Sequence, residues 1–107
     1  MTDKIQQLIE GAKQKEISFA AVISTIDSLY QHRPTAFKNG DTFNEATQNQ
    51  GSARVFSFAK LNKLSKESTL WLFAEHYHAV LNNPEGKDHQ NIRQFMLHGW
   101  AGVEFEN

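Results

Sequence analysis

The sequence predicts an α+β domain in which about four helices pack on a small, mostly antiparallel sheet or partial barrel. Three observations predict this class: apolar residues recur at helical spacing in four stretches, an Asn39-Gly40 pair lies between them, and residues 55–59 alternate as in a half-buried strand. The chain has 107 residues, of which 39% are hydrophobic. We therefore expect residues 1–107 to form a single domain with one modest core.

Composition excludes several classes of function. The protein has no cysteine, which excludes disulfides and thiolate chemistry. Its formal net charge of -1 gives no electrostatic signature of nucleic-acid binding. No run approaches the ~20 apolar residues of a membrane span, and the N-terminus lacks the regions of a cleaved signal peptide. We therefore expect a soluble protein with neither nucleic acid nor membrane as a partner, whose export would use an uncleaved signal.

The first 30 residues predict two helices. Thr2 or Asp3 can cap the first helix, and Ser18 can cap the second. The second helix ends before Pro34, because the residue that precedes a proline is disfavoured in helical conformation. Their apolar stripes follow helical spacing. The residues of these stripes are Ile5, Leu8, Ile9 and Ala12 in the first helix, and Phe19, Val22, Ile23, Ile26, Leu29 and Tyr30 in the second.

The middle of the sequence predicts a hairpin, a polar loop and a strand. Asn39-Gly40 is a strong hairpin signal, because both residues tolerate positive φ. Residues 42–52 contain almost no aliphatic side chains, so they form either a solvated loop or the lining of a polar site. The alternation in residues 55–59 predicts a strand with Phe56 and Phe58 in the core. Residues 103–105 predict an edge strand that completes the sheet.

Two further helices are expected after the middle segment. Ser65 can cap the third, which has Glu67 in its first turn and ends near Pro84. Asp88 can cap a short fourth helix that ends at Gly99. The inward residues are Leu70, Phe73, Tyr77, Val80 and Leu81 in the third helix, and Ile92, Phe95 and Met96 in the fourth.

Polar side chains before, within and after the third helix, together with Trp100, form a candidate polar cleft. A carboxylate that orients His89 beside Arg93 could serve general base chemistry on an anionic or sugar-like substrate. In the structural alternative, Asp88 caps a helix, Arg93 pairs with Glu45 or Asp41, and the amides satisfy loop backbone. The sequence leaves the catalytic residues unassigned. The residues of the candidate cleft are Asn44, Glu45, Gln48, Asn49, Glu75, Asp88, His89, Asn91, Arg93 and Trp100.

Histidines and aromatic residues also offer ligand atoms and stacking surfaces. Glu75, His76 and His78 carry atoms that bind zinc, as do His89 and His98. On a helix, however, His76 and His78 lie about 200° apart, so they cannot share one ion. We therefore predict no metal and no cofactor. The tryptophans and most phenylalanines are predicted to pack in the core, because no basic neighbours suggest a platform for bases.

The sequence also resembles a known family. The motifs that carry the resemblance are Phe37-x-Asn39-Gly40, Asn44-Glu45-x-x-Gln48-Asn49-x-Gly51-Ser52, Phe58-Ala59-x-Leu61-Asn62-x-Leu64-Ser65, Thr69-Leu70, Tyr77, Val80-Leu81-x-x-Pro84, Asp88-His89-x-Asn91-Ile92-Arg93-x-Phe95-Met96 and His98-Gly99-Trp100-Ala101-Gly102. In this order they are similar to the HopJ-type type III effector family over residues 19–105. The resemblance implies a bacterial protein of a family named after a protein delivered into plant cells, and it implies no reaction, cofactor or catalytic residue. The sequence departs from the expected pattern at Ala53, where a cysteine is expected, and at His76 and His78.

Two functions of different class follow from these observations. The preferred one is a non-enzymatic, effector-like interaction module that binds a host or bacterial protein through the polar cleft. The alternative is a small enzyme or ligand-binding protein that acts on a carbohydrate-like or anionic small molecule with His89, Arg93, Glu45 and Glu75. We expect the protein in the cytoplasm of the producing bacterium, and secretion by a type III system follows from the resemblance alone. The oligomeric state is not predicted.

Overall fold

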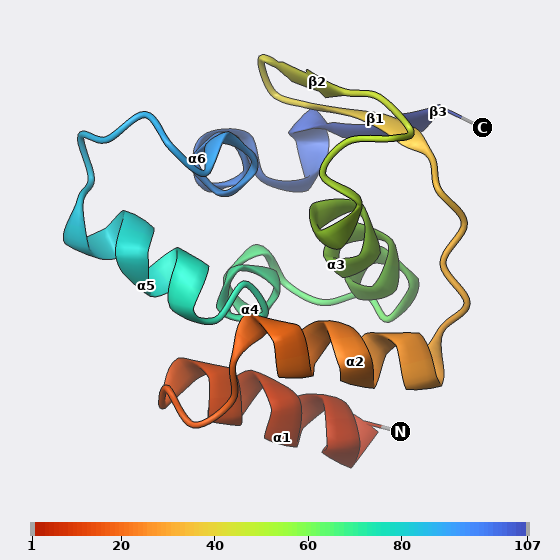
Figure 1. Ribbon diagram of the computed structural model, residues 1–107, viewed down its shortest axis with the longest axis vertical. Helices are drawn as coiled ribbons and strands as arrows, with labels where there is room; N and C mark the ends of the chain where they lie inside the picture. Colours follow the sequence, from red (N-terminus) through yellow and green to blue (C-terminus); the bar gives the residue numbers. More distant parts are fainter. Residues whose placement is uncertain (1, 107) are drawn as a thin grey trace.

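The computed structural model describes residues 2–106, and the side chains of residues 4–105. Over this range the protein forms six α-helices, one 3-10 helix and a three-stranded sheet, which confirms the predicted α+β class. Figure 1 shows the strands at one end of the molecule and the two N-terminal helices at the other. The elements are α1 (Thr2–Lys13), α2 (Phe19–Leu29), β1 (Ala36–Asn39), β2 (Thr42–Asn44), α3 (Gln50–Leu61), α4 (Lys66–Trp71), α5 (Glu75–Asn82), α6 (Gln90–His98), η1 (Gly99–Gly102) and β3 (Val103–Glu106).

The sheet is the predicted hairpin plus the C-terminal strand. Its order is β2-β1-β3, and both pairs are antiparallel, so β3 is an edge strand as expected. Asn39 pairs with Thr42, which leaves Gly40 and Asp41 as the turn. Gly40 has φ +59°, and this is the conformation that glycine adopts without strain. Asn39 belongs to the strand instead of the turn, and its side chain is buried.

The predicted strand at residues 55–59 is wrong, because this segment lies inside helix α3. Val55, Phe56, Phe58 and Ala59 are all buried. These four residues are spaced by one, three and four positions, which fits a helix that is buried on more than one side. From the sequence alone, a short apolar run of this kind cannot be told from a buried strand. The last residues of the predicted polar loop, Gln50 to Ser52, form the first turn of α3.

The predicted third helix is broken into α4 and α5. Between them Leu72, Phe73 and Ala74 are all buried. Successive residues of a straight helix point about 100° apart, so three in a row cannot all face one core. The break between α4 and α5 lets all three side chains face the core, and Ala74 within it has φ 51°. Leu81, predicted to point inward, is 44% exposed.

The helix ends confirm most of the predicted caps. Ser18 Oγ accepts from Ala21 N at 3.2 Å, Ser65 Oγ accepts from Ser68 N at 3.1 Å, and α6 ends at Gly99 with φ 61°. The side chains of Thr2 and Asp3 lie outside the described residues. The cap predicted at Asp88 is wrong: His89 precedes α6, and it makes no side-chain capping hydrogen bond.

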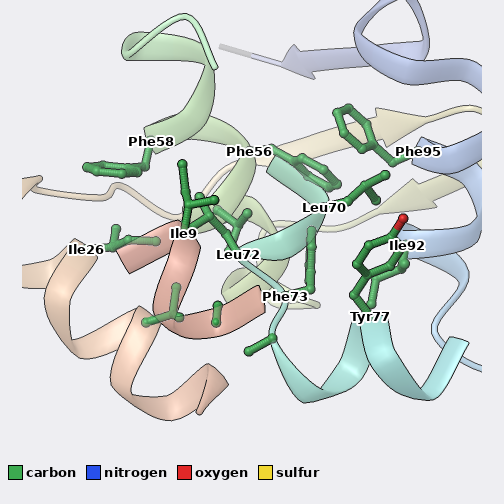
Figure 2. Close-up of a cluster of buried hydrophobic side chains, with 14 of the residues drawn as sticks. Ile9, Ile26, Phe56, Phe58, Leu70, Leu72, Phe73, Tyr77, Ile92 and Phe95 are labelled. Carbon is green, nitrogen blue, oxygen red and sulfur yellow. The ribbon is translucent and has the colours of Figure 1, made fainter. Parts of the chain in front are cut away.

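The core is built around Phe56, whose ring lies 4.9 Å from that of Phe95 and 5.5 Å from that of Phe73 (Figure 2). Phe58 is also buried, as predicted. Trp100 packs on Phe95 with ring centroids 5.0 Å apart. The six helices thus share one hydrophobic cluster with the sheet. Within residues 2–106, none of the helices is long and apolar enough to span a membrane.

Candidate functional site

One hollow of the surface combines residues from both halves of the sequence. It has a volume of about 370 Å³ and lies where the starts of α2, α3, α5 and α6 and strand β2 meet. We call it the His76–His89 cleft. Its lining residues are Phe19, Thr42, Asn49, Gly51, Ser52, Phe73, His76, His89, Gln90, Asn91 and Ile92.

Two helices begin at this cleft with left-handed residues. Asn49, before α3, has φ 49°, and His89, before α6, has φ 51°. Neither residue caps its helix with its side chain. The first hydrogen bonds of the two helices run from Ala53 N to Asn49 O and from Ile92 N to His89 O. In the described part of the protein, the backbone N–H groups of residues 51, 52, 90 and 91 therefore have no protein acceptor, and helix starts carry partial positive charge.

Two histidine rings contact one another at the cleft. The ring centroids of His76 and His89 lie 5.1 Å apart, with 39° between the ring planes. The ring of Phe19 packs edge-on against His76 at 4.9 Å, which fixes one wall. The side chain of His89 is 32% exposed, and its Nε2 lies 4.0 Å from Asp88 Oδ2. Of the side chains that line the cleft, none has a carboxylate.

A buried cluster of amides holds the two helix starts. Asn44 and Asn91 exchange hydrogen bonds: Asn44 Nδ2 donates to Asn91 Oδ1 at 3.1 Å, and Asn91 Nδ2 donates to Asn44 Oδ1 at 3.0 Å. Asn49 Nδ2 donates to Asn44 Oδ1 at 2.6 Å, and Asn39 Nδ2 donates to the Asn91 carbonyl at 2.7 Å. The cluster therefore joins both strands of the hairpin to α3 and α6. The structural alternative expected these amides to satisfy loop backbone, whereas most of their hydrogen bonds run between amide side chains.

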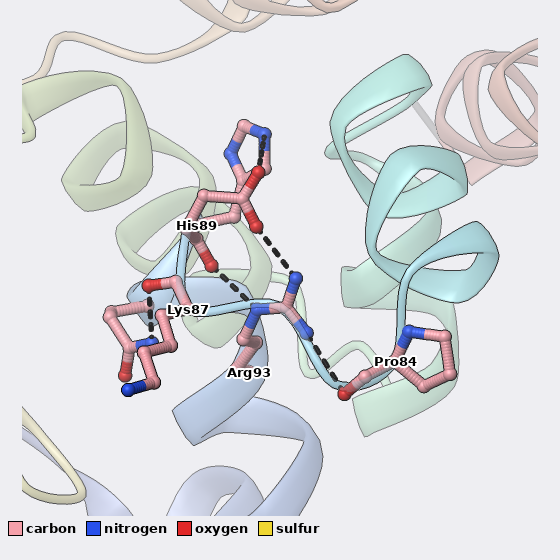
Figure 3. A network of polar contacts seen from close by, with 6 residues as sticks. Pro84, Lys87, His89 and Arg93 are labelled. Carbon is pink, nitrogen blue, oxygen red and sulfur yellow. Dashed lines mark hydrogen bonds and ion pairs between the residues drawn. The ribbon is translucent and has the colours of Figure 1, made fainter.

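Arg93 is hydrogen-bonded to the loop before α6 (Figure 3). Its Nη2 donates to Asp88 Oδ1 at 2.6 Å, its Nε to the Asp88 carbonyl at 2.6 Å, and its Nη1 to the Pro84 carbonyl at 3.1 Å. The hydrogen bond from Arg93 holds the pKa of Asp88 below its usual value. The predicted pairing of Arg93 with Glu45 or Asp41 is wrong, since its carboxylate partner is Asp88.

The other predicted cleft residues lie outside the His76–His89 cleft. Glu75 Oε1 accepts from Phe19 N at 2.6 Å, so it satisfies the start of α2. Gln48 Oε1 accepts from Glu45 N at 3.1 Å within the loop after β2. Trp100 Nε1 donates to the Leu64 carbonyl at 3.0 Å. Of the ten predicted residues, the cleft brings together Asn49, His89 and Asn91.

Sequence reasoning missed several residues of the cleft. His76 offered a signal only as a metal ligand, and Ser52 only as part of the polar segment 42–52. Phe19 and Gln90 gave no signal, because nothing local distinguishes them from ordinary first-turn residues. The described residues contain no group of three histidine, aspartate or glutamate side chains that could hold a metal ion. The cleft thus offers imidazoles, hydroxyls and backbone N–H groups.

The fold and this cleft define a small α+β protein with a candidate binding site rich in hydrogen-bond donors. The protein belongs to the HopJ family, because the family model described as HopJ type III effector protein matches residues 2–107. It is also similar to a crystal structure of a protein of unknown function, VPA0580. That likeness has a TM-score of 0.85 and 43% sequence identity, and it covers 95% of this chain and 88% of the other. No curated protein matches the sequence.

Proposed function

We propose that this HopJ-family protein is a non-enzymatic interaction module that uses the His76–His89 cleft to hold an anionic or strongly hydrogen-bond-accepting group of its partner. The observation that carries the proposal is the set of four backbone N–H groups without a protein acceptor at the cleft. They belong to two separate helix starts, where the helix dipole favours a negative charge. A carboxylate or phosphate group has the chemistry to accept from them.

The side chains of the cleft support the same type of group. His76 and His89 supply ring N–H donors, and Ser52 and Thr42 supply hydroxyls. None of the described lining side chains is a carboxylate, and the carboxylate of Asp88 lies 4.0 Å from His89 Nε2. Phe19 and Phe73 stack with ring centroids 5.9 Å apart, and they add an apolar wall. A few placed polar groups beside an apolar wall are typical of binding sites.

A binding role is favoured over catalysis by the positions of the four residues that a reaction would use. His89 lines the cleft, but Arg93 is bound to the loop at Asp88 and Pro84. Glu75 is bound to the start of α2. Glu45 lies in the loop after β2, outside the cleft. For Ser52, no described side chain is within hydrogen-bonding distance to act as a base.

The family context supports a protein as the partner. The family model is described as a type III effector protein. We therefore propose that the protein is made in the bacterial cytoplasm, that a type III system exports it, and that the group bound in the cleft belongs to a host protein or to a bacterial one. An acidic side chain, a C-terminal carboxylate or a phosphorylated residue has the required chemistry.

The test is a titration of the ¹⁵N-labelled protein followed by ¹H–¹⁵N correlation spectra. Inorganic phosphate and acetate are the anionic probes, and methyl glucoside is the uncharged probe. We expect phosphate to shift the amide signals of Gly51, Ser52, Gln90 and Asn91 more than those elsewhere. Methyl glucoside should leave them unchanged.

A matched pair of variants controls for a general charge effect. His76→Gln combined with His89→Asn removes both cleft imidazoles, and asparagine tolerates the left-handed conformation of residue 89. His98→Gln removes an exposed imidazole outside the cleft. The first variant should weaken phosphate binding, and the second should not. Shifts that spread over the whole surface, or a response to the sugar alone, would contradict an anion site.

A further inference from the structure

A second hollow lies beside the linker that joins α2 to β1. Its volume is about 910 Å³, and it shares no lining residue with the His76–His89 cleft. Tyr30, Gln31 and residues 33–36 form one side, the last turns of α3 form another, and Phe105 of β3 contributes an aromatic ring. Figure 1 shows this linker running from the end of α2 to the start of β1 beside α3. We call this hollow the Arg33–Lys60 groove.

The charges of the groove have one sign. Arg33 and Lys60 both line it and both are exposed, whereas none of its described lining side chains is a carboxylate. Neither cation takes part in an ion pair with the side chains that the structure describes. The formal net charge of the whole protein is -1, so this cationic pair is a local feature. A groove with two unneutralised cations favours an acidic ligand.

The groove also exposes apolar surface next to the cations. Leu61, the last residue of α3, is 65% exposed. Lys60 Nζ lies 5.7 Å from the ring centroid of Phe105, so the ammonium group is held over the groove wall. Tyr30 packs on Phe58 with ring centroids 6.4 Å apart, which anchors the opposite wall to the core.

The wall formed by the linker is fixed by α3. Gln50 Oε1 accepts from Thr35 N at 3.2 Å and lies 2.9 Å from His32 Nε2. Gln50 Nε2 donates to the Thr35 carbonyl at 3.3 Å. Residues 31–35 belong to no helix or strand, and these hydrogen bonds tie them to α3. A preformed wall lowers the entropy cost of docking an extended peptide.

We propose that the Arg33–Lys60 groove docks an acidic segment of a partner protein, with carboxylates on Arg33 and Lys60 and one large apolar side chain on Leu61 and Phe105. The proposal rests on charge complementarity between the groove and the segment. It does not depend on the function proposed for the His76–His89 cleft.

Fluorescence anisotropy tests the proposal with a short fluorescein-labelled peptide in which glutamates flank a single tryptophan. A peptide with glutamines in place of the glutamates is the control ligand. We expect the acidic peptide to bind, the control peptide to bind at least about tenfold more weakly, and raising NaCl from about 50 to about 500 mM to weaken the acidic complex.

Charge-reversal variants locate the site. Arg33→Glu with Lys60→Glu should lower the affinity for the acidic peptide by about tenfold or more, because like charges then face each other. Lys4→Glu with Lys87→Glu makes the same change in net charge at exposed positions outside the groove and should alter affinity by less than about twofold. Absence of binding to the wild type, or equal losses in both double variants, would overturn the proposal. So would loss of binding in His76→Gln with His89→Asn, because the peptide would then occupy the cleft instead.

Discussion

At the scale of single residues, the buried amide cluster dominates the molecule. Asn91 accepts from Asn39 and Asn44 and donates to Asn44, and all three side chains are buried. The change Asn91→Ala would leave several of these amide groups without a partner away from water. We expect it to lower the free energy of unfolding by about 3 kcal/mol. Urea denaturation of the variant beside the wild type measures this loss.

A matched substitution separates the cluster from a general effect of removing asparagine. Asn82→Ala changes an exposed asparagine at the end of α5 that makes no side-chain hydrogen bond within the described residues. It should change stability by less than about 0.5 kcal/mol. Equal losses in the two variants would show that the amide cluster contributes nothing special to the fold.

At the scale of elements, the start of α3 holds two irregular segments through one side chain. Gln50 Nε2 donates to the carbonyls of Gln48 at 2.8 Å and Thr35 at 3.3 Å, while its Oε1 accepts from Thr35 N. Gln50→Glu keeps the acceptor but turns the donor into a carboxylate that faces carbonyl oxygens. We expect a loss of about 1 to 2 kcal/mol and faster proteolysis of residues 31–35 and 45–48.

The control for this variant is Gln48→Glu. Gln48 lies in the same loop, and its side chain acts as an acceptor from Glu45 N, a role that glutamate retains. Its stability and its rate of cleavage should stay close to those of the wild type. If Gln48→Glu is cleaved as fast as Gln50→Glu, added charge in the loop is the cause and not the lost hydrogen bonds.

Elements that depend on local chemistry could be predicted from the sequence, and those that depend on tertiary packing could not. Ser18 and Ser65 cap helix starts and Gly99 ends a helix. Each acts through hydrogen bonds and torsion angles within a few residues, so these helix ends could be predicted. The α3 segment was predicted as a strand because the spacing of its apolar residues fits both the period of a strand and that of a helix. The positive φ of Ala74 and His89 gives no local signal, because packing imposes it on residues that rarely adopt it.

At the scale of the whole molecule, the sequence predicted the class, the sheet and the family but only part of the cleft. The cleft gathers the starts of four helices, which come together only when α3 is a helix and the third predicted helix is broken. Both features were missed, so the sequence placed His76 within an unbroken helix and Phe19 in a core stripe. Asn49, His89 and Asn91 lie in the two polar segments of the candidate cleft, and these three line the His76–His89 cleft.

The stability of the whole fold should depend on pH through the loop that joins α5 to α6. The hydrogen bond from Arg93 lowers the pKa of Asp88 from its ordinary value of 3.8. Because the pKa is lower in the folded protein than in the unfolded one, this stabilisation is present above pH 3.8 and is lost as the pH falls through the folded value. Urea midpoints of the wild type and Asp88→Asn should therefore differ near neutral pH, with the wild type more stable, and converge in acid. A difference that stays constant from neutral pH into acid would mean that asparagine perturbs the loop sterically and that the charge on Asp88 contributes nothing to stability.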